Sequence, residues 1–374
     1  MLDVTLIVLC AGNSTRFEHK TKKQWIRIAN EPLWLNVTKR LASYSKFDSI
    51  IVASHEKELN YMKNFTDDYT FVKGGNTRQE SILNCLEKVK TKYVMITDVA
   101  RACIPQNVIL NLLNEKDNAD CIVPVLNVTD TVIYETNTIN RDNVKLIQTP
   151  QLSNTQILKN ALDTKIEFTD ESSAIKNING TIKYIQGSNE SKKLTLGNEL
   201  EELPCLTPPS NNFFTGTGFD IHAFEDNKEM FLGGVKLPYE YGFKAHSDGD
   251  VLIHSVIDAL LGASGAGDIG EFFPDTDEKY KGIDSKILLN EIVSFIYNVG
   301  YEIVNVDLTI IAQKPKINPF KNEIKTSMAN LLGIEKQFVN IKATTAEKMG
   351  FIGRAEGIAV QSIATLKYYN WKTK

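Results

Sequence analysis

The chain has 374 residues, 42% of them hydrophobic and 24% charged, with a formal net charge of -4. At about 150 residues per domain, this length predicts two domains, and the composition is typical of a globular protein rather than a disordered or fibrous one. Lysine and arginine do not exceed the acidic residues, which argues against nucleic acid or an anionic membrane as a partner. No stretch approaches the roughly 18 apolar residues that cross a bilayer.

The cysteines and the first residues indicate the compartment. Five cysteines are scattered along the chain without a Cys-x-x-Cys pair, which argues against a disulfide framework and fits a reducing cytoplasm. The opening MLDVTLIVLCAGNSTRF has no basic segment ahead of its apolar run, so it predicts a buried strand and not a signal peptide. We therefore expect a soluble, cytoplasmic protein.

In the first two hundred residues, short apolar runs alternate with amphipathic stretches. Strands are predicted at 2–9, 49–53, 93–97 and 121–125, and the apolar stripe of SILNCLEKVK predicts a helix over 81–90. Such alternation is typical of βαβ units around a mainly parallel sheet. The first half is therefore predicted to be α/β.

The stretch LEELPCLTPPSNN interrupts both periodicities with prolines and polar residues. It places the domain boundary at about 204–212, giving predicted domains at 1–207 and 208–374. Beyond it we predict strands at 213–219 and 305–312, helices at 250–261, 284–298 and 320–332, and two closing strands. The second half is therefore predicted to be α+β, with helices packed on one face of a sheet.

The first strand ends in a glycine turn that offers a phosphate site. Backbone N–H groups of the turn at 11–16 can hold phosphate oxygens, and Arg16 adds a delocalised positive charge. A plain strand-to-helix turn with a surface arginine would give the same pattern, so this loop is weak alone. Lys23, the second glycine-rich loop GGNTRQES and Asp98 at the end of a strand strengthen the hypothesis. Asp98 suits Mg²⁺, which prefers carboxylates together with substrate phosphates.

Together these motifs resemble the 2-C-methyl-D-erythritol 4-phosphate cytidylyltransferases, a branch of the Rossmann-like nucleotide-diphospho-sugar transferase fold, over residues 1–205. The resemblance implies that the chain's nucleotide-binding and catalytic residues include Ala11, Gly12, Arg16, Lys23, Gly75, Arg78 and Ser81 for CTP, Asp98 for Mg²⁺ or Mn²⁺, and Arg141 and Lys193 for methylerythritol phosphate. The family's paired alanines are Cys10-Ala11 here, and its Asp-Ala-Ala-Arg-Pro reads Asp98-Val-Ala-Arg-Ala. Neither change removes a charge. Taken alone, Arg141 and Lys193 are more typical of solvated surface charges than of substrate ligands.

Histidines gather in the second half. Of the five in the chain, His222, His246 and His254 fall within 33 residues. Asp220 and His222 are two apart on a predicted strand, so both point to one face. His254 lies four residues after Asp250 on a predicted helix, and Asp250 is expected to orient it. One carboxylate and two imidazoles with a free fourth position are the pattern of a catalytic zinc.

Four further stretches, AHSDGDVLIH, GDIGEFFPDTD, NVDLTIIAQKPK and ATTAEKMGFIGRAEG, resemble the 2-C-methyl-D-erythritol 2,4-cyclodiphosphate synthases over residues 213–369. The resemblance implies zinc on Asp220, His222 and His254, a second divalent cation, Mg²⁺ or Mn²⁺, on Glu347, and catalytic roles for His246 and Thr345. It further implies substrate or nucleotide contacts by Ser247, Asp268, Ile269, Gly270, Phe273, Pro274, Asp275, Thr276, Asp277, Ala312, Gln313, Lys314, Pro315, Lys316, Thr344, Phe351 and Arg354. Family members form each site between neighbouring subunits of a trimer, so a homo-oligomer is expected, and dimers through the first half would make a hexamer.

The resemblances predict a bifunctional enzyme of isoprenoid-precursor synthesis. Its first half would transfer CMP from CTP to methylerythritol phosphate and release pyrophosphate. Its second half would cyclise the CDP-linked 2-phosphate and release CMP, after a kinase step performed elsewhere. Two alternatives stay open: a sugar nucleotidyltransferase fused to a different metal hydrolase, and a scaffold or metal-storage protein with one catalytically dead half.

Overall fold

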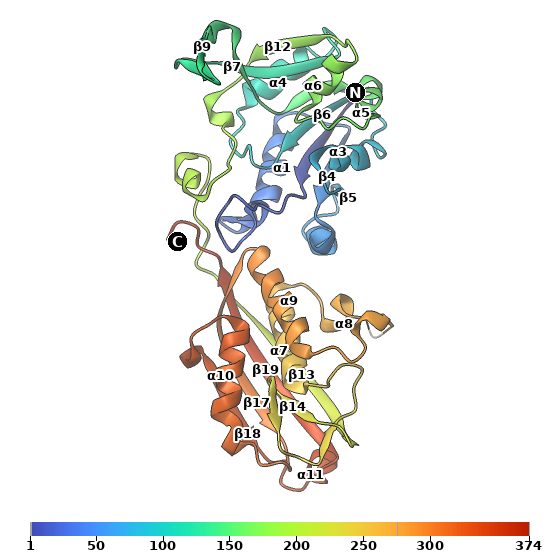
Figure 1. The fold of residues 1–374 in the computed structure, drawn as a ribbon, viewed down its shortest axis with the longest axis vertical. Coiled ribbons are helices and arrows are strands. Elements are labelled where there is room, and N and C mark those ends of the chain that lie inside the picture. Colours follow the sequence, from blue (N-terminus) through green and yellow to red (C-terminus); the bar gives the residue numbers. More distant parts are fainter. Residues whose placement is uncertain (1, 275, 374) are drawn as a thin grey trace. The chain divides into compact units, whose positions relative to one another are not determined.

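The computed structural model describes residues 2–274 and 276–373 (Figure 1). It divides into two compact units, the first running to Pro209 and including the C-terminal residues from Asn370, the second comprising Ser210–Tyr369. Among the described residues, none of the helices combines the length and the apolar character needed to span a membrane.

The first unit is α/β, as predicted, and its sheet is mixed. The sheet order is β10-β7-β11-β6-β1-β4-β5, with β12 beside β7. The strands are β1 (Val4–Cys10), β4 (Ser49–Ser54), β5 (Thr70–Lys73), β6 (Tyr93–Asp98), β7 (Cys121–Asn127), β10 (Lys145–Ile147), β11 (Gln151–Asn154) and β12 (Ile182–Gln186), with short hairpins β2 (Arg27–Ile28)/β3 (Glu31–Pro32) and β8 (Val132–Tyr134)/β9 (Asn137–Ile139). β1 runs parallel to β4 and β6, whereas β10 and β11 run antiparallel to their neighbours. The carboxyl ends of β1 and β6 therefore meet at one edge.

The helices of this unit pack on the sheet through their apolar faces. They are α1 (Leu33–Tyr44), α2 (Leu59–Lys63), α3 (Arg78–Leu86), α4 (Gln106–Asn114), α5 (Thr155–Leu162) and α6 (Glu171–Asn177). Ile82, Cys85 and Leu86 of α3 are buried in the core with Ile96 of β6. α3 begins three residues before the predicted 81 because Thr77 caps it, its Oγ1 accepting from Glu80 N at 3.1 Å. The cap places Arg78 at the first turn.

The sequence argues against a disulfide framework, but the structure contains a disulfide among its described residues. Cys103 and Cys205 form a disulfide with a Cα–Cα separation of 5.7 Å, while Cys10, Cys85 and Cys121 are buried free thiols. The two bonded cysteines are 102 residues apart in sequence. The spacing of cysteines in the sequence does not predict such a pair, because only the tertiary fold brings the end of the first unit next to the loop after β6. Arg40 supports this juxtaposition by donating to the carbonyls of Ala102 and Cys205.

The second unit is α+β, also as predicted. Its sheet order is β16-β13-β19-β17-β18, with a separate β14/β15 hairpin. The elements are β13 (Phe213–Asp226), β14 (Met230–Leu232), β15 (Val235–Leu237), β16 (Tyr241–Phe243), α7 (Val251–Ser264), α8 (Ile269–Phe272), α9 (Ser285–Asn298), β17 (Tyr301–Ile311), α10 (Lys321–Leu332), β18 (Val339–Thr344), α11 (Gly350–Gly353) and β19 (Gly357–Tyr368). β17 and β18 are parallel, and the other pairs of the sheet are antiparallel. Figure 1 shows α7 and α10 lying over this sheet.

The two faces of β13 differ. Gly216 and Gly218 alternate onto the face covered by α7, where they are buried. Phe213, Phe219 and Ile221 point to the opposite face and are 65%, 58% and 40% exposed. One face of the sheet is thus covered by helices, and the other presents large apolar side chains.

The C-terminal residues contribute to the first unit through Trp371. This side chain is only 6% exposed, and its Nε1 donates to the carbonyl of Arg27 at 2.8 Å. We expect Trp371→Ala to destabilise the first unit by about 3 kcal/mol, the usual cost of truncating a buried aromatic side chain. Chemical denaturation followed by circular dichroism would measure this change in the free energy of unfolding. Trp371→Phe keeps a ring and should lose only about 1 kcal/mol; equal stability of Trp371→Ala and wild type would contradict the expectation.

Candidate active sites

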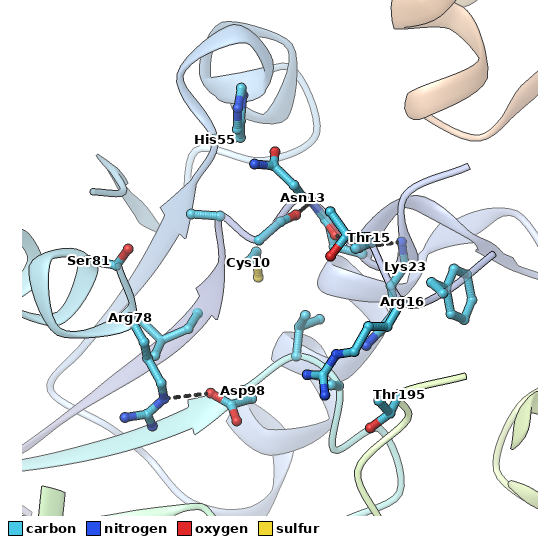
Figure 2. Close-up of a pocket in the computed structure, with 18 of the residues that line it drawn as sticks. Cys10, Asn13, Thr15, Arg16, Lys23, His55, Arg78, Ser81, Asp98 and Thr195 are labelled. Carbon is cyan, nitrogen blue, oxygen red and sulfur yellow. Dashed lines mark hydrogen bonds and ion pairs between the residues drawn. The ribbon is translucent and has the colours of Figure 1, made fainter. Parts of the chain in front are cut away.

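A pocket of about 410 Å³ opens at the carboxyl ends of β1 and β6 (Figure 2). The predicted residues that line it are Ala11, Gly12, Arg16, Lys23, Gly75, Arg78, Ser81, Asp98 and Lys193. Asn13 also lines it, as part of the predicted phosphate-binding turn at 11–16, whereas sequence reasoning gave no role to the lining residues Gln24, His55, Asn76 and Thr195. Gln24 follows the predicted Lys23, and Asn76 lies within the predicted loop GGNTRQES, so the neighbouring residues in sequence could have indicated both. His55 follows β4, and no motif marked it.

A hydrogen-bond network holds the first loop in place. Gln24 Nε2 donates to the carbonyl of Gly12 at 3.0 Å, and Ser14 Oγ donates to Gln24 Oε1 at 3.1 Å. Lys23 N donates to Ser14 Oγ at 3.0 Å. Ser14 itself has a φ of 56°, in the left-handed region. The loop and the short helix at Lys23–Trp25 are therefore fixed to each other, which sets the position of Lys23.

Asp98 is the acidic centre of this pocket. Its Oδ1 lies 3.1 Å from Arg78 Nε and its Oδ2 lies 2.7 Å from Lys193 Nζ; Figure 2 shows the first of these contacts. Arg78 also pairs with the buried Glu171 at 2.9 Å. Burial opposes ionisation of Asp98, but the charges of Arg78 and Lys193 outweigh it and lower its pKa to about 2. Asp98 is therefore an ionised carboxylate at neutral pH, as a magnesium ligand must be.

Positive charge surrounds this carboxylate. Lys23 Nζ donates to the carbonyl of Leu194 and lies in the same pocket as Arg16 and Lys193. Burial, followed by the charges of Lys193 and Arg16, lowers the pKa of Lys23 to about 8. Such a cluster of cations is suited to a polyanionic ligand, whose charge would relieve their mutual repulsion.

The structure does not bring Arg141 into this pocket. Arg141 begins the short helix Arg141–Asn143, is exposed, and donates through Nη1 to the carbonyl of Thr129. It lies in the segment that carries the β8/β9 hairpin, where Ile133 and Tyr134 are 65% and 67% exposed. Within one chain Arg141 is therefore an exposed residue outside the pocket, and its contact with the substrate stays a prediction.

In the second unit, three predicted metal ligands converge. One ligand atom from each of Asp220, His222 and His254 lies within 4.8 Å of the others. Asp220 Oδ2 is 3.2 Å from His222 Nδ1 and 3.4 Å from His254 Nδ1. Burial disfavours the charged carboxylate, but the two imidazoles more than compensate and depress the pKa of Asp220 well below its usual value. His222 Nδ1 is buried and makes no hydrogen bond among the described residues, so this donor set fits a metal ion.

Two glycines bring the ligands together. A Cβ on Gly218 would lie 1.9 Å from the carbonyl oxygen of Ser255, and one on Gly216 would lie 2.2 Å from the backbone N of Ala263. Any side chain at these positions would push α7 away from β13. The glycines of GTGFD therefore permit the close approach that sets His254 beside His222.

A pocket of about 320 Å³ surrounds this cluster. Besides the three ligands, the predicted residues His246, Ser247, Ile269, Gly270 and Phe273 line it. Four other predicted residues, Asp268, Pro274, Thr276 and Asp277, do not line this pocket. Asp268 instead caps α8, and Asp277 caps the following turn. Asp275 lies outside the described residues. Sequence reasoning missed Asp258, Tyr280, Ile283 and Leu288. Asp258 lies one turn after His254 as an acidic residue on an apolar helix, and that spacing was a usable clue.

Asp250 does not orient His254, which corrects the sequence-based expectation. Its carboxylate is fully buried and accepts from the backbone N–H groups of Gly233, Gly234 and Ile253 at 2.6 to 3.1 Å. Asp250 is thus the N-cap of α7, a position whose side chain turns back to the helix end rather than along the helix. The i, i+4 spacing holds only for residues within the helix.

The remaining predicted residues form a separate group in the second unit. Thr345 Oγ1 donates to Glu347, Lys348 N donates to Gln313 Oε1 at 3.3 Å, and Ala312 N donates to the carbonyl of Thr344 at 3.0 Å. This group lies beyond the ends of β17 and β18. None of Ala312, Gln313, Lys314, Pro315, Lys316, Thr344, Thr345, Glu347, Phe351 and Arg354 lines the pocket around His222.

Comparisons with known proteins agree on both halves. The family 2-C-methyl-D-erythritol 4-phosphate cytidylyltransferase matches residues 4–203, and the YgbB family matches residues 213–367. Over 374 residues, covering all of both chains, the sequence is 83% identical to the bifunctional enzyme IspD/IspF of Aliarcobacter butzleri. Over 372 residues it is 53% identical to the enzyme of the same name from Campylobacter fetus, covering 100% of this chain and 99% of that one.

A solved structure supports the same assignment. The bifunctional IspDF of Campylobacter jejuni superposes with a TM-score of 0.88 at 46% identity, covering 99% of this chain and 100% of that one. The chain therefore belongs to the family of bifunctional IspD/IspF enzymes of the methylerythritol phosphate pathway, with a cytidylyltransferase in its first half and a cyclodiphosphate synthase in its second.

Proposed function

We propose that the pocket of the first unit binds CTP and methylerythritol phosphate and joins them at the α-phosphorus of CTP. The observation that carries this proposal is the group of three cations, Arg16, Lys23 and Lys193, around the ionised Asp98. The phosphate of the second substrate attacks, and charge builds on the departing pyrophosphate, so stabilising that charge is the main task of the protein. No protein nucleophile is required.

Asp98 would hold Mg²⁺, or Mn²⁺, together with the phosphates of CTP. Bound there, the cation supplies Lewis-acid stabilisation of the phosphates. Lys193 now pairs with Asp98 at 2.7 Å, so metal binding would free its ammonium for the substrate phosphate. Arg78 would keep its ion pair with Glu171 and remain in place.

In the second unit we propose zinc on Asp220, His222 and His254, with the CDP-linked 2-phosphate of methylerythritol as substrate. Zinc at this position supplies charge neutralisation for one phosphate, while Glu347 and its cation would hold the diphosphate. His246 and Ser247, which line the pocket, would fix the attacking phosphate in line with the β-phosphorus. CMP is the leaving group.

We infer that a second copy of the chain completes this second site. The cytidine-binding candidates Thr344, Thr345 and Lys314 do not line the pocket around His222 in their own chain. The helix-free face of β13 exposes Phe213, Phe219 and Ile221, an apolar surface suited to self-association. A trimer through this face, and a hexamer with a further contact through the β8/β9 hairpin, follow as proposals. A cytoplasmic location is part of the same proposal, since the first reaction uses CTP.

One experiment tests both activities and the nearest alternative. The purified chain should release pyrophosphate from CTP and methylerythritol phosphate, and CMP from the CDP-linked 2-phosphate. CTP should be preferred over UTP, GTP and ATP, which separates this proposal from a sugar nucleotidyltransferase of other specificity. Release of neither product would refute the proposal.

CTP binding is expected to weaken at alkaline pH because of Lys23. With its pKa lowered to about 8, Lys23 is charged below that pH, and above it the free protein must take up a proton to bind the triphosphate. The Kd for CTP should therefore rise about tenfold per pH unit above 8. Calorimetric titration between pH 7 and 9.5 would measure this. Lys23→Arg keeps its charge over the range and should show no such rise, and a wild-type Kd independent of pH would contradict the expectation.

A further inference from the structure

A chain of hydrogen bonds lies behind His254, on the side away from Asp220. His254 Nε2 is 2.9 Å from Ser285 Oγ, and Ser285 Oγ is 2.5 Å from Asp248 Oδ1. Ser285 N also donates to Asp248 Oδ2 at 3.2 Å. Ser285 is the first residue of α9 and is fully buried, so its hydroxyl is fixed by the fold. These residues come from separate segments that pack together: the loop before α7, α7 itself and the start of α9.

The direction of these hydrogen bonds follows from their chemistry. A carboxylate only accepts, so the single hydroxyl proton of Ser285 goes to Asp248. The oxygen of Ser285 is then left to accept from Nε2–H of His254. A neutral imidazole with its proton on Nε2 has its lone pair on Nδ1. That Nδ1 is the atom that faces Asp220 at 3.4 Å.

We propose that Ser285, held by Asp248, is the positioning residue that fixes the tautomer and ring orientation of His254 for metal binding. This inference rests on the proposed zinc site. It replaces the role that the sequence suggested for Asp250, whose carboxylate is committed to backbone N–H groups. Ser247 Oγ, at 3.2 Å from the same Nε2, adds a second contact to the ring.

Zinc affinity of the full-length chain tests this directly. Competition with a chromophoric chelator should show that Ser285→Ala binds Zn²⁺ about 10- to 100-fold more weakly than wild type, the usual effect of removing an outer-shell partner. Ser294→Ala is the matched control, because Ser294 lies on the same helix, is exposed and, within the described part of the chain, donates only to the carbonyl of Asn290. Its zinc affinity should equal that of wild type.

A second variant separates positioning from packing. Asp248→Asn keeps the shape of the side chain, but its amide can donate to Ser285 Oγ. The hydroxyl then donates to His254 Nε2 and favours the tautomer with its proton on Nδ1, which cannot bind metal. We expect zinc affinity to fall about tenfold or more, with the unfolding midpoint of the zinc-free protein within a few degrees of wild type. Nitrogen-15 NMR of zinc-loaded wild type should show His254 protonated on Nε2.

The outcomes are distinguishable. Zinc affinities of Ser285→Ala and Asp248→Asn equal to that of wild type would overturn the positioning role and leave the zinc site intact. A proton on Nδ1 of His254 in the loaded protein would also overturn it. If wild type itself bound no zinc, the proposed function of the second unit would fail, and this inference with it.

Discussion

His222→Ala is expected to abolish zinc binding and to lower CMP release by about 10³-fold, while pyrophosphate release stays at the wild-type rate. His222 Nδ1 is buried 3.2 Å from Asp220 and has no other partner among the described residues, so its removal leaves the metal two protein ligands. Loss of a Lewis acid that neutralises a phosphate costs several kcal/mol of transition-state stabilisation, and about 4 kcal/mol corresponds to 10³-fold. Steady-state assays of both products and elemental analysis measure the effect.

The preserved reaction is the internal control for this variant. The two candidate pockets are lined by residues of different units. A substitution in one pocket is therefore expected to leave the reaction of the other unchanged. Loss of both activities in a folded variant would contradict independent sites. Undiminished CMP release would remove the zinc cluster from the mechanism.

Asp98→Asn is expected to have the reciprocal effect. Pyrophosphate release should fall at least about 10²-fold, and CMP release should be unchanged. The variant removes the ionised carboxylate that pairs with Arg78 and Lys193 and that is proposed to hold Mg²⁺. Loss of one preorganised electrostatic group costs about 10²- to 10³-fold in comparable sites. His222→Ala, with normal pyrophosphate release, serves as its matched control.

Calorimetry of CTP binding tests whether Asp98 acts by holding Mg²⁺. Wild type should bind CTP more tightly with Mg²⁺ than without it, and Asp98→Asn should lose this difference. A first half that is catalytically dead, as in the scaffold alternative, would show no magnesium-dependent binding in wild type. Full pyrophosphate release by Asp98→Asn would refute the role of this carboxylate.

Features set by local periodicity were predictable from the sequence. Asp220 and His222 fall on one face of β13 because side chains two apart in a strand share a face, and they do meet. The glycine loop and Asp98 follow strands β1 and β6, which are parallel neighbours, so their carboxyl ends were bound to lie together. The predicted strands and helices agree with the structure to within about four residues, except that β13 continues to Asp226, well beyond the predicted end at 219.

Features set by tertiary packing were not predictable. The disulfide joins cysteines 102 residues apart, and Ser285 reaches His254 from a helix 31 residues further on. Asp250 lies four residues before His254, which is the spacing of neighbours on a helix. As the N-cap, however, its carboxylate accepts hydrogen bonds from backbone N–H groups and does not contact His254. Arg141 was assigned to the substrate by resemblance, whereas in its own chain it lies outside the pocket. A single sequence does not distinguish a residue that acts in its own chain from one that acts in another copy.

Diffraction from crystals of the zinc-loaded protein, recorded at wavelengths on either side of the zinc absorption edge, tests the central assignment most directly. The account predicts one anomalous peak per chain, bonded to Asp220, His222 and His254 through a carboxylate oxygen and the two Nδ1 atoms. A peak bound by other residues, or no peak among these three in a protein that still releases CMP, would contradict it.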